Sequence, residues 1–406
     1  MVCRYRICTE LTQICNYAQG LTHFGANGIY MANTYSEEPA LPKAKNDIRE
    51  GHDNFFTPLR LLFASLVVFG HTFAVALRDS TSEPHVLYHF TFSYLAVNLF
   101  FIASGFLVTK SMVYRGDAPS FISARALRIF PALIVHVLFV MLIIGPLGTN
   151  VPLLAFFSDP DWYMQPLMVL TFFETHMVMP GMFETNGENL GSAPLWTLRF
   201  EVLAYIGTLL VFSLGFLRKK WMVLLQFILP SIAWIMGQHF GIFDKLPTTI
   251  ENLARFGIAY GLGATIYAYR DRVSFSWIAF IALAIGSFIL RDTPVLEVMI
   301  NLLLGWFIFR AAYLRMPKFD WMQRIPDLSY GIYIYHWCVM QLLFYWMPHL
   351  SAIELFALTF PPTVGLAAMS WYIVEKPALN SKTRFANWMR NIGLKRPISN
   401  RELLLD

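Results

Sequence analysis

Two ionisable residues interrupt an otherwise apolar run, LRLLFASLVVFGHTFAVAL, at positions 59–77. Arg60 and His71 are eleven residues apart, so a helix places both on nearly the same face, about 16 Å apart along its axis. An ionisable group in an apolar helix is costly and normally faces the protein interior or a wet cavity. For Arg60 alone, a side chain that snorkels to the membrane surface explains the sequence equally well. His71 alone could make one interhelical hydrogen bond, but the pair on one face favours function.

Two further arginines follow in the segment FISARALRIFPAL. Arg125 and Arg128 are three residues apart and therefore share a helix face. Their forked guanidinium groups suit a polyanion, because each binds phosphate through two parallel hydrogen bonds. The alternative is ordinary anchoring by basic residues on the cytoplasmic side of a membrane.

A carboxylate stands in another apolar segment, SAPLWTLRFEVLAYI. We expect Glu201 near the outer end of that helix, at roughly the depth of His71. A carboxylate there would orient an imidazole and stabilise its protonated form, as in other nucleophile–base–orienter arrangements. A structural ion pair with Arg199 or Arg255 explains Glu201 equally well.

A second histidine lies in LSYGIYIYHWCVM. Tyr330, Tyr333 and His336 recur at spacings of three, close to one helix face. The tyrosines fit either an aromatic belt at the membrane interface or core packing. His336 is harder to explain structurally, because it falls near the middle of the predicted span, and we regard it as a candidate catalytic residue.

The helices that position these residues are predicted to be transmembrane. The chain has 406 residues, of which 56% are hydrophobic and only 14% charged, whereas soluble domains carry about a quarter charged residues. So much apolar surface predicts an all-α, polytopic membrane protein. Runs of about 20 apolar residues indicate about ten spans, at residues 56–77, 90–109, 127–148, 196–217, 221–240, 251–269, 273–290, 294–314, 328–347 and 353–374. The apolar segment 151–175 is broken by FFSDPDWYMQP and is predicted to be interfacial or re-entrant.

Gly261 and Gly263 lie in another predicted span, and we attribute them to close helix packing.

The charges of the connecting loops fix the predicted orientation. Every second loop is basic, and the loops between them hold few Lys or Arg residues, with none in residues 149–198. Cytoplasmic loops carry the excess of Lys and Arg, so an even number of spans with both termini in the cytoplasm is predicted. The Lys and Arg residues behind the net charge of +5 are therefore concentrated on one side of the membrane. This distribution indicates no nucleic-acid partner.

The chain divides into three predicted parts. Residues 1–54 form a polar N-terminal tail, residues 55–378 a membrane domain and residues 379–406 a basic cytoplasmic tail. Residues 1–30 differ in character from the rest, and we expect Met31 to be the true start. Three of the four cysteines (Cys3, Cys8 and Cys15) lie near His23 without a standard metal spacing, so we expect no metal, with a zinc site as the weaker alternative.

Taken together, these motifs resemble the membrane-bound acyltransferase family 3, which acylates hydroxyl groups of cell-surface carbohydrates and other acceptors. The resemblance covers about residues 55–378. The matching elements, in chain order, are Arg60 with His71, FFIASGF (100–106), RALRIFP (125–131), LWTLRFE (195–201), SYGIYIYHW (329–337) and EKP (375–377). The chain departs from the family pattern at Thr197, where the family has serine.

The resemblance implies a membrane O-acyltransferase that moves an acyl group, most often acetyl, from acyl-CoA to a hydroxyl of a carbohydrate or glycolipid. A bacterial inner membrane is the implied location. His71 is the implied general base, because the ordinary pKa of histidine suits proton transfer at neutral pH; Arg60, Glu201 and His336 would assist it. Arg125, Arg128 and Ser104 would bind the donor, and no metal is implied.

Two other functions fit parts of the sequence. A transporter or flippase for a glycolipid or acylated carrier also uses many spans and intramembrane charges, but it predicts inverted repeats or paired broken helices, which the sequence does not clearly show. A catalytically inactive partner in an envelope polysaccharide complex is the third reading, and it is disfavoured because Arg60 and His71 are both present. The sequence leaves open whether the acyl group reaches an outer acceptor on bound donor or through a covalent intermediate on His71.

Overall fold

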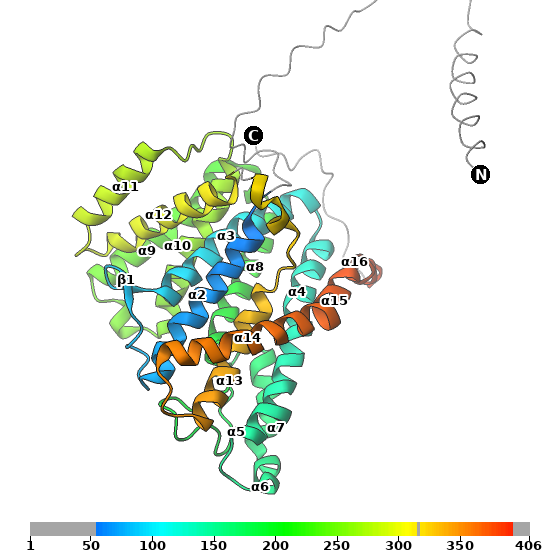
Figure 1. Ribbon diagram of the computed structural model, residues 1–406. Helices are drawn as coiled ribbons and strands as arrows, with labels where there is room; N and C mark the ends of the chain where they lie inside the picture. Colours follow the sequence, from blue (N-terminus) through cyan, green and yellow to red (C-terminus); the bar gives the residue numbers. More distant parts are fainter. Residues whose placement is uncertain (1–53, 315–316, 393–406) are drawn as a thin grey trace, which may run out of the picture. The chain divides into compact units, whose positions relative to one another are not determined.

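The computed structural model describes residues 54–314 and 317–392, which are almost entirely helical (Figure 1). The longer helices are α2 (Phe56–Ala76), α3 (Phe92–Arg115), α4 (Ala118–Phe139), α7 (Pro160–Leu170), α8 (Trp196–Ser213), α9 (Lys220–His239), α10 (Thr248–Ala268), α11 (Trp277–Ile289), α12 (Val295–Ala312), α13 (Ser329–Trp346), α14 (Ala352–Ser370) and α16 (Lys382–Asn391). The shorter elements are β1 (His85–Leu87), β2 (Phe90–Thr91), η1 (Val140–Ile144), α5 (Gly145–Gly148), α6 (Leu153–Ser158), η2 (Ala193–Leu195), η3 (Phe216–Arg218), η4 (Phe243–Lys245), η5 (Pro317–Arg324), η6 (Trp371–Glu375) and α15 (Lys376–Asn380).

Each of the ten segments predicted to span the membrane is helical. Seven helices in the described residues are long and apolar enough to cross a membrane. Helices α10 and α13 are 21 and 18 residues long, but they are less apolar and are mostly buried among the other helices, and α11 has only 13 residues. The structure therefore confirms the nearly all-α membrane fold, while the count of ten and the cytoplasmic termini stay predictions.

The break predicted within residues 151–175 is confirmed. The segment forms two short helices, α6 and α7, of 6 and 11 residues. They are separated at Asp159, whose side chain accepts a hydrogen bond from the backbone N–H of Asp161 at 2.8 Å. An aspartate in this position satisfies a free N–H group of the next helix and starts that helix in a new direction.

Glycines let α10 lie directly against two neighbouring helices, as the sequence predicts. A Cβ atom on Gly263 would lie 2.0 Å from the carbonyl oxygen of Ile102 in α3. One on Gly261 would lie 2.0 Å from the carbonyl oxygen of Gln226 in α9. Gly105 of the FFIASGF motif contacts the same interface from α3. Backbones this close require glycine, so these residues fix the spacing of three central helices.

A buried polar cluster ties α3, α10 and α12 together. The Glu297 carboxylate accepts hydrogen bonds from the Tyr94 hydroxyl at 2.9 Å, from Asn98 at 3.0 Å and from Asn301 at 2.8 Å. Arg255 donates to the side-chain oxygen of Asn98 at 3.2 Å. Buried polar groups are stable when they are hydrogen-bonded in this way, and the cluster places the guanidinium of Arg255 against α3.

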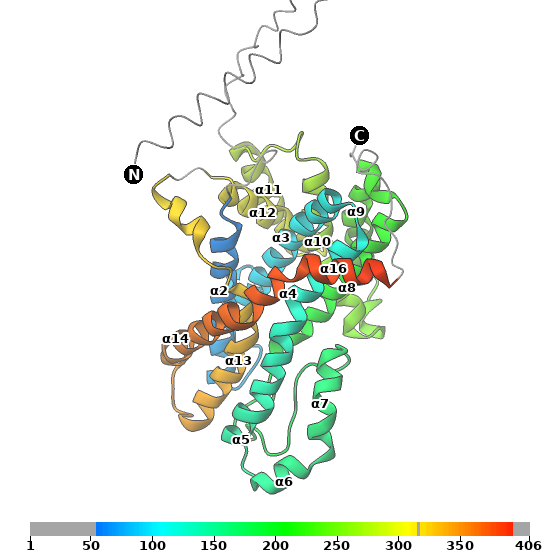
Figure 2. The ribbon, with the colours of Figure 1, turned by 90° about the vertical axis from the view of Figure 1, so that its right-hand side faces the viewer.

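The C-terminal run of helices from α14 to α16 crosses the other helices at a steep angle in both side views (Figures 1 and 2). It is continuous through η6, a π-helical turn. Arg390 near its end forms an ion pair with Asp117 at 2.5 Å and donates to the Ser120 hydroxyl at 2.6 Å. Burial of Asp117 raises its pKa, but the hydrogen bonds from Arg390 and Ser120 outweigh this and the net shift is downward. Part of the predicted tail is thus a helix fixed to the start of α4.

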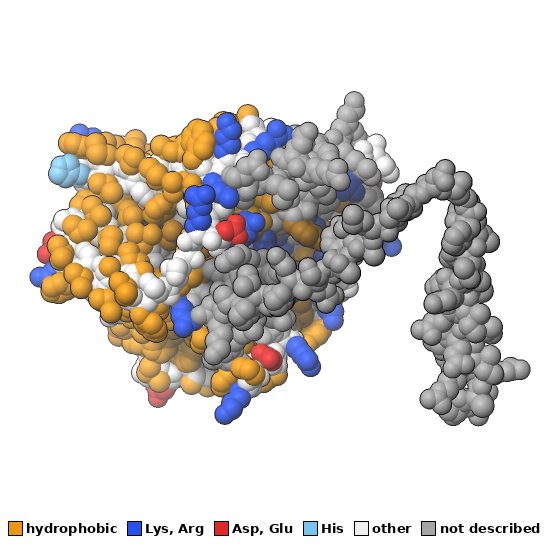
Figure 3. Space-filling view, turned by 90° about the horizontal axis from the view of Figure 1, so that it is seen from above, with side chains coloured by type: hydrophobic (Ala, Val, Ile, Leu, Met, Phe, Trp, Pro, Cys, Tyr) orange, Lys and Arg blue, Asp and Glu red, His pale blue; other side chains and the backbone are white. Residues whose placement is uncertain are grey.

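The charged side chains are unevenly distributed over the surface. Seen from above, one end of the bundle carries Lys and Arg side chains around a largely apolar body, with few Asp or Glu side chains in view (Figure 3). The start of α2 and the end of α3 lie toward this end (Figure 1). This is the end that the loop charges predict to face the cytoplasm.

Candidate active site

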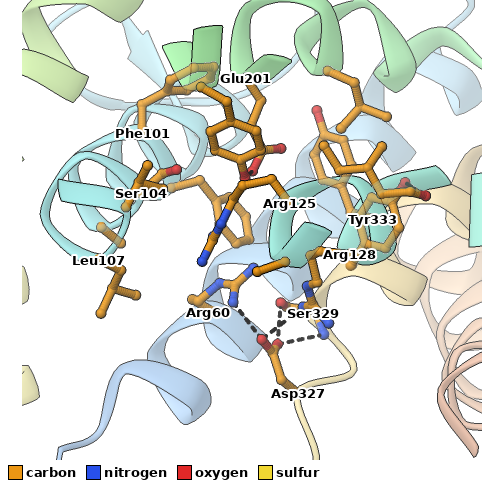
Figure 4. Close-up of a pocket in the computed structure, with 18 of the residues that line it drawn as sticks. Arg60, Phe101, Ser104, Leu107, Arg125, Arg128, Glu201, Asp327, Ser329 and Tyr333 are labelled. Atoms are coloured by element: carbon orange, nitrogen blue, oxygen red, sulfur yellow. Dashed lines mark hydrogen bonds and ion pairs between the residues drawn. The ribbon is translucent and has the colours of Figure 1, made fainter. Parts of the chain in front are cut away.

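A cavity of about 470 Å³ lies among α2, α3, α4, α8 and α13, and the C-terminal run of helices forms part of its wall. It brings together Arg60, Ser104, Arg125, Arg128 and Glu201 (Figure 4). These residues come from four different helices and were all predicted as site residues. The cavity is within the usual size range for small-molecule sites, about 300–1,000 Å³.

Asp327 holds two of the arginines. Its carboxylate forms ion pairs with Arg60 at 2.5 Å and with Arg128 at 2.8 Å, and it accepts a hydrogen bond from the Ser329 hydroxyl at 2.5 Å (Figure 4). Burial opposes ionisation of this carboxyl group, but the two guanidinium groups lower the pKa of Asp327 to about 2. Asp327 therefore stays charged at any physiological pH.

Arg128 has a second carboxylate partner. Its other terminal nitrogen lies 3.1 Å from the carboxylate of Glu375, which also accepts a hydrogen bond from Ser370 at 3.1 Å. Glu375 is fully buried and belongs to the EKP motif at the end of η6. Two arginines and two carboxylates thus form one charge-balanced network that joins α2, α4, η6 and the loop before α13.

Arg125 differs from its neighbours in having no carboxylate partner among residues 54–314 and 317–392. Its guanidinium lies 5.6 Å from the centre of the Tyr205 ring, and its Nε is buried without a hydrogen-bond partner in this part of the chain. Figure 4 shows the group pointing toward Arg60. Two more cations, Arg115 and Lys382, line the same cavity. Five cations therefore face it against two carboxylates, and Arg125, Arg115 and Lys382 carry the unbalanced charge.

Glu201 does not contact His71 in the described structure, contrary to the predicted arrangement. Its carboxylate accepts a hydrogen bond from the hydroxyl of Tyr205, one turn further along α8, and it lines the arginine cavity. The ion pairs with Arg199 or Arg255 offered as alternatives do not form there either. The place predicted for Glu201 beside the imidazole is taken by a residue of α13.

That residue is His336. Nδ1 of His71 lies 2.9 Å from Nε2 of His336, and the rings stack with centroids 5.2 Å apart. Nδ1 of His336 lies 3.1 Å from the carbonyl oxygen of Ile332. A carbonyl only accepts, so this Nδ1 carries a proton and Nε2 of His336 accepts the hydrogen bond from His71. We infer that Nε2 of His71 is left unprotonated, as a general base requires.

Tyr333 stands between the cavity and this histidine pair. Its side chain lines the cavity, and its ring centroid lies 6.1 Å from that of His336, one turn along α13. Its hydroxyl is 2.7 Å from the hydroxyl of Thr197, the residue that replaces the serine of the family pattern. A threonine keeps the hydroxyl that this contact uses, so the departure preserves the interaction.

Sequence reasoning missed several residues of the site. Asp327 is missing from the predicted site, although it lies two residues before the SYGIYIYHW motif, in a loop rich in basic residues. Glu375 was noted as part of a motif but without a partner. Arg115 lies in one of the basic loops and Lys382 in the basic tail, and from the sequence the charge of these segments indicates only how the chain is oriented in the membrane. Of the predicted cysteine and histidine positions, Cys3, Cys8, Cys15 and His23 lie outside the described residues.

Comparison with known proteins identifies the family of the chain. The family model described as an acyltransferase domain matches residues 54–372. Nodulation protein 10 of Rhizobium leguminosarum bv. viciae is 31% identical over 366 residues, which cover 83% of this chain and 96% of that protein. The O-acetyl transferase of Shigella phage Sf6 is 25% identical over 334 residues, covering 80% and 95%. No solved structure gives a significant match. The chain therefore belongs to the membrane-bound acyltransferase family 3, and it is an O-acyltransferase.

Proposed function

We propose that the protein transfers an acetyl group from acetyl-CoA, or a related acyl group from its CoA thioester, to a hydroxyl of a cell-surface or exported carbohydrate. The proposed location is the bacterial inner membrane. The observation that carries this proposal is a strongly cationic cavity whose wall residue Tyr333 packs against His336 of a histidine pair. The cavity suits a phosphorylated donor, and the histidine pair supplies a base for a hydroxyl acceptor.

The cavity has two kinds of lining that match the two ends of such a donor. Its cations suit the phosphates of the nucleotide end. Its apolar side chains, which include Phe100, Phe101 and Leu107, suit the less polar thioester arm. Since Tyr333 lines the cavity and adjoins His336, a thioester that reaches Tyr333 approaches the histidine pair.

The chemistry uses Nε2 of His71 as the base. The acceptor hydroxyl gives its proton to Nε2 while its oxygen attacks the thioester carbonyl carbon. The carbon–sulfur bond of the resulting tetrahedral intermediate then breaks, and the thiolate of CoA takes the proton back from His71. An ester and free CoA thiol are formed, and His71 returns to its starting state. His336 holds His71 in the required tautomer throughout.

The relatives support the choice of acyl group. One of them is named an O-acetyl transferase, which favours acetyl over a longer acyl chain. The other name refers to nodulation and specifies no substrate. The carbohydrate acceptor rests on the family resemblance and on the acid-rich segment between α5 and α8, which holds Trp162 and Tyr163 beside polar loops.

The test is mass spectrometry of surface carbohydrate from cells that express the wild type, His71→Ala, His239→Ala or no protein, at matched membrane levels. His239 is an exposed histidine at the end of α9 and serves as the matched control. We expect the acetyl mass increment with the wild type and His239→Ala, and its loss with His71→Ala and without protein. An increment that persists in His71→Ala would exclude His71 as the base. Identical spectra with and without the protein would refute the carbohydrate acceptor and direct the search to another hydroxyl acceptor.

A further inference from the structure

Two of the unbalanced cations, Arg115 and Lys382, stand at helix ends at the edge of the cavity. Arg115 is about 22 Å further along α3 than Phe100, whose ring contacts that of Tyr333. Arg115 is the last residue of α3 and Lys382 is the first residue of α16. Arg115 is half-buried and its Nε donates to the Ser111 hydroxyl at 3.1 Å, while Lys382 is exposed. Neither has a carboxylate partner in the described part of the chain. Both therefore keep charge available for an anion.

Arg128, by contrast, is already neutralised. Its two terminal nitrogens bind Asp327 and Glu375, and its side chain is only 14% exposed. Moving it to a phosphate would leave the buried Glu375 without its cation and Asp327 with Arg60 alone, and an unpaired buried carboxylate is strongly unfavourable. The pair Arg125 and Arg128, which the sequence suggests as one phosphate clamp, is thus divided by the structure: Arg125 is available and Arg128 is not.

The position of Lys382 is fixed by the rest of α16. Arg390 holds that helix to Asp117 and Ser120, in the loop that follows Arg115 and at the start of α4. This contact keeps the first turn of α16 at the edge of the cavity, on the side where α3 ends. Arg390 therefore acts as a positioning residue for Lys382, which lines the same cavity as Arg115.

We propose that Arg115 and Lys382 bind the 3′-phosphate on the ribose of the CoA donor, and that Arg125 binds its diphosphate. This assignment rests on the proposed CoA donor. It follows from the order of groups along the cavity: the thioester end must lie near Tyr333, so the nucleotide end lies at the outer edge. The 3′-phosphate is a doubly charged group at that end, and a guanidinium with an ammonium group is suited to it.

The experiment measures the dissociation constants of CoA and of 3′-dephospho-CoA for the full-length protein in nanodiscs of uncharged phosphatidylcholine. We expect the wild type to prefer CoA by about tenfold or more, since hydrogen bonds between charged groups are among the strongest in proteins. The double variant Arg115→Gln/Lys382→Gln should lose this preference and keep the wild-type affinity for 3′-dephospho-CoA. That retained affinity also shows that the variant is folded.

Two further variants sharpen the test. Lys376→Gln/Arg384→Gln removes the same charge from exposed positions of α15 and α16 that do not line the cavity, and it should retain the preference. Arg390→Gln should reduce the preference, because α16 is released, without changing the affinity for 3′-dephospho-CoA.

Three other results would contradict different parts of the proposal. Equal affinities of the wild type for the two ligands would overturn the 3′-phosphate site but leave CoA as the donor. A preference that survives in Arg115→Gln/Lys382→Gln, or that disappears in the control, would overturn the assignment of these residues. Binding of neither ligand to the wild type would refute the CoA donor itself, and with it the proposed function.

Discussion

The imidazoles of His71 and His336 are joined by a hydrogen bond of 2.9 Å, although the residues are 265 positions apart in the chain. The bond connects α2 to α13, and the carbonyl of Ile332 sets its direction. The two histidines therefore have different roles: His336 is held by the backbone of its own helix, and it orients His71.

Replacing these histidines should give unequal losses of activity. His71→Ala should lower the rate of acetyl transfer by about 10²–10⁴-fold, the usual contribution of a general base. His336→Ala should lower it less, and His336→Gln should restore part of the rate, because an amide oxygen can accept the hydrogen bond from His71. The measurement is the initial rate in membrane vesicles at saturating donor. If glutamine proves no better than alanine, His336 does not act by accepting this hydrogen bond.

The Asp327 network should stabilise the protein above acidic pH. Asp327→Asn leaves Arg60 and Arg128 without a shared counter-charge. We expect the free energy of unfolding to fall by about 2–3 kcal/mol, which corresponds to the lowered pKa of Asp327. The folded pKa of about 2 lies below the ordinary value of 3.8. The contribution of Asp327 is therefore fully present above the unfolded pKa and is lost as the pH falls toward the folded one.

Thermal unfolding of the wild type and Asp327→Asn in detergent, at a series of pH values, checks this expectation. The gap between their midpoints should be constant from about pH 5 to pH 8 and should close below about pH 4. A gap that widens on acidification would contradict the assigned pKa, and equal midpoints at neutral pH would show that the network contributes no stability.

Close helix packing at Gly263 should not tolerate a side chain. Its added Cβ would lie 2.0 Å from the carbonyl oxygen of Ile102, so Gly263→Ala must separate α3 from α10. We expect a loss of about 1–3 kcal/mol in the free energy of unfolding, as for other overpacked sites. Gly365→Ala is the matched control, because a Cβ there meets open space and alanine is the better helix former. Equal thermal stability of the two variants would disprove this packing.

The hydroxyl of residue 197 should matter more than its methyl group. Thr197→Ser keeps the contact with the Tyr333 hydroxyl at 2.7 Å and restores the family residue, so its activity should stay within about twofold of wild type. Thr197→Val has nearly the same shape but leaves the buried Tyr333 hydroxyl with fewer partners, and should lose activity and stability. Similar rates for serine and valine variants would show that the hydroxyl has no role.

The helices and most of the cavity were predictable from the sequence. Long apolar runs identify helices directly, and the spacing of Arg125 and Arg128 places both on one face of α4. Their shared cavity with Arg60 follows because ionisable groups avoid lipid. Apolar runs and residue spacing are enough to predict features that depend on a single helix, such as its position in the chain and the face that carries its charged residues.

The pairing of side chains was not predictable in the same way. Asp327 meets Arg60, and Glu375 meets Arg128, only because α2, α4 and the C-terminal helices pack at particular rotations and depths. The prediction that Glu201 orients His71 failed for this reason: an estimated depth does not specify which helix faces which. The split between Arg125 and Arg128 likewise depends on carboxylates that lie about 200 or more residues away.

The π-helical turn at Trp371–Glu375 accommodates one residue more than a regular helix would hold. A π-helical turn is equivalent to one extra residue within an α-helix, and its wider turn leaves the direction of the following helix nearly unchanged. A chain that lacks one residue there would form an ordinary α-helical turn and keep Lys382 and Arg390 close to their present positions. A single deletion in a regular α-helical part of the run would instead rotate everything after it by about 100°. Among related proteins, this short segment should therefore accept the loss of one residue more readily than the rest of the run does.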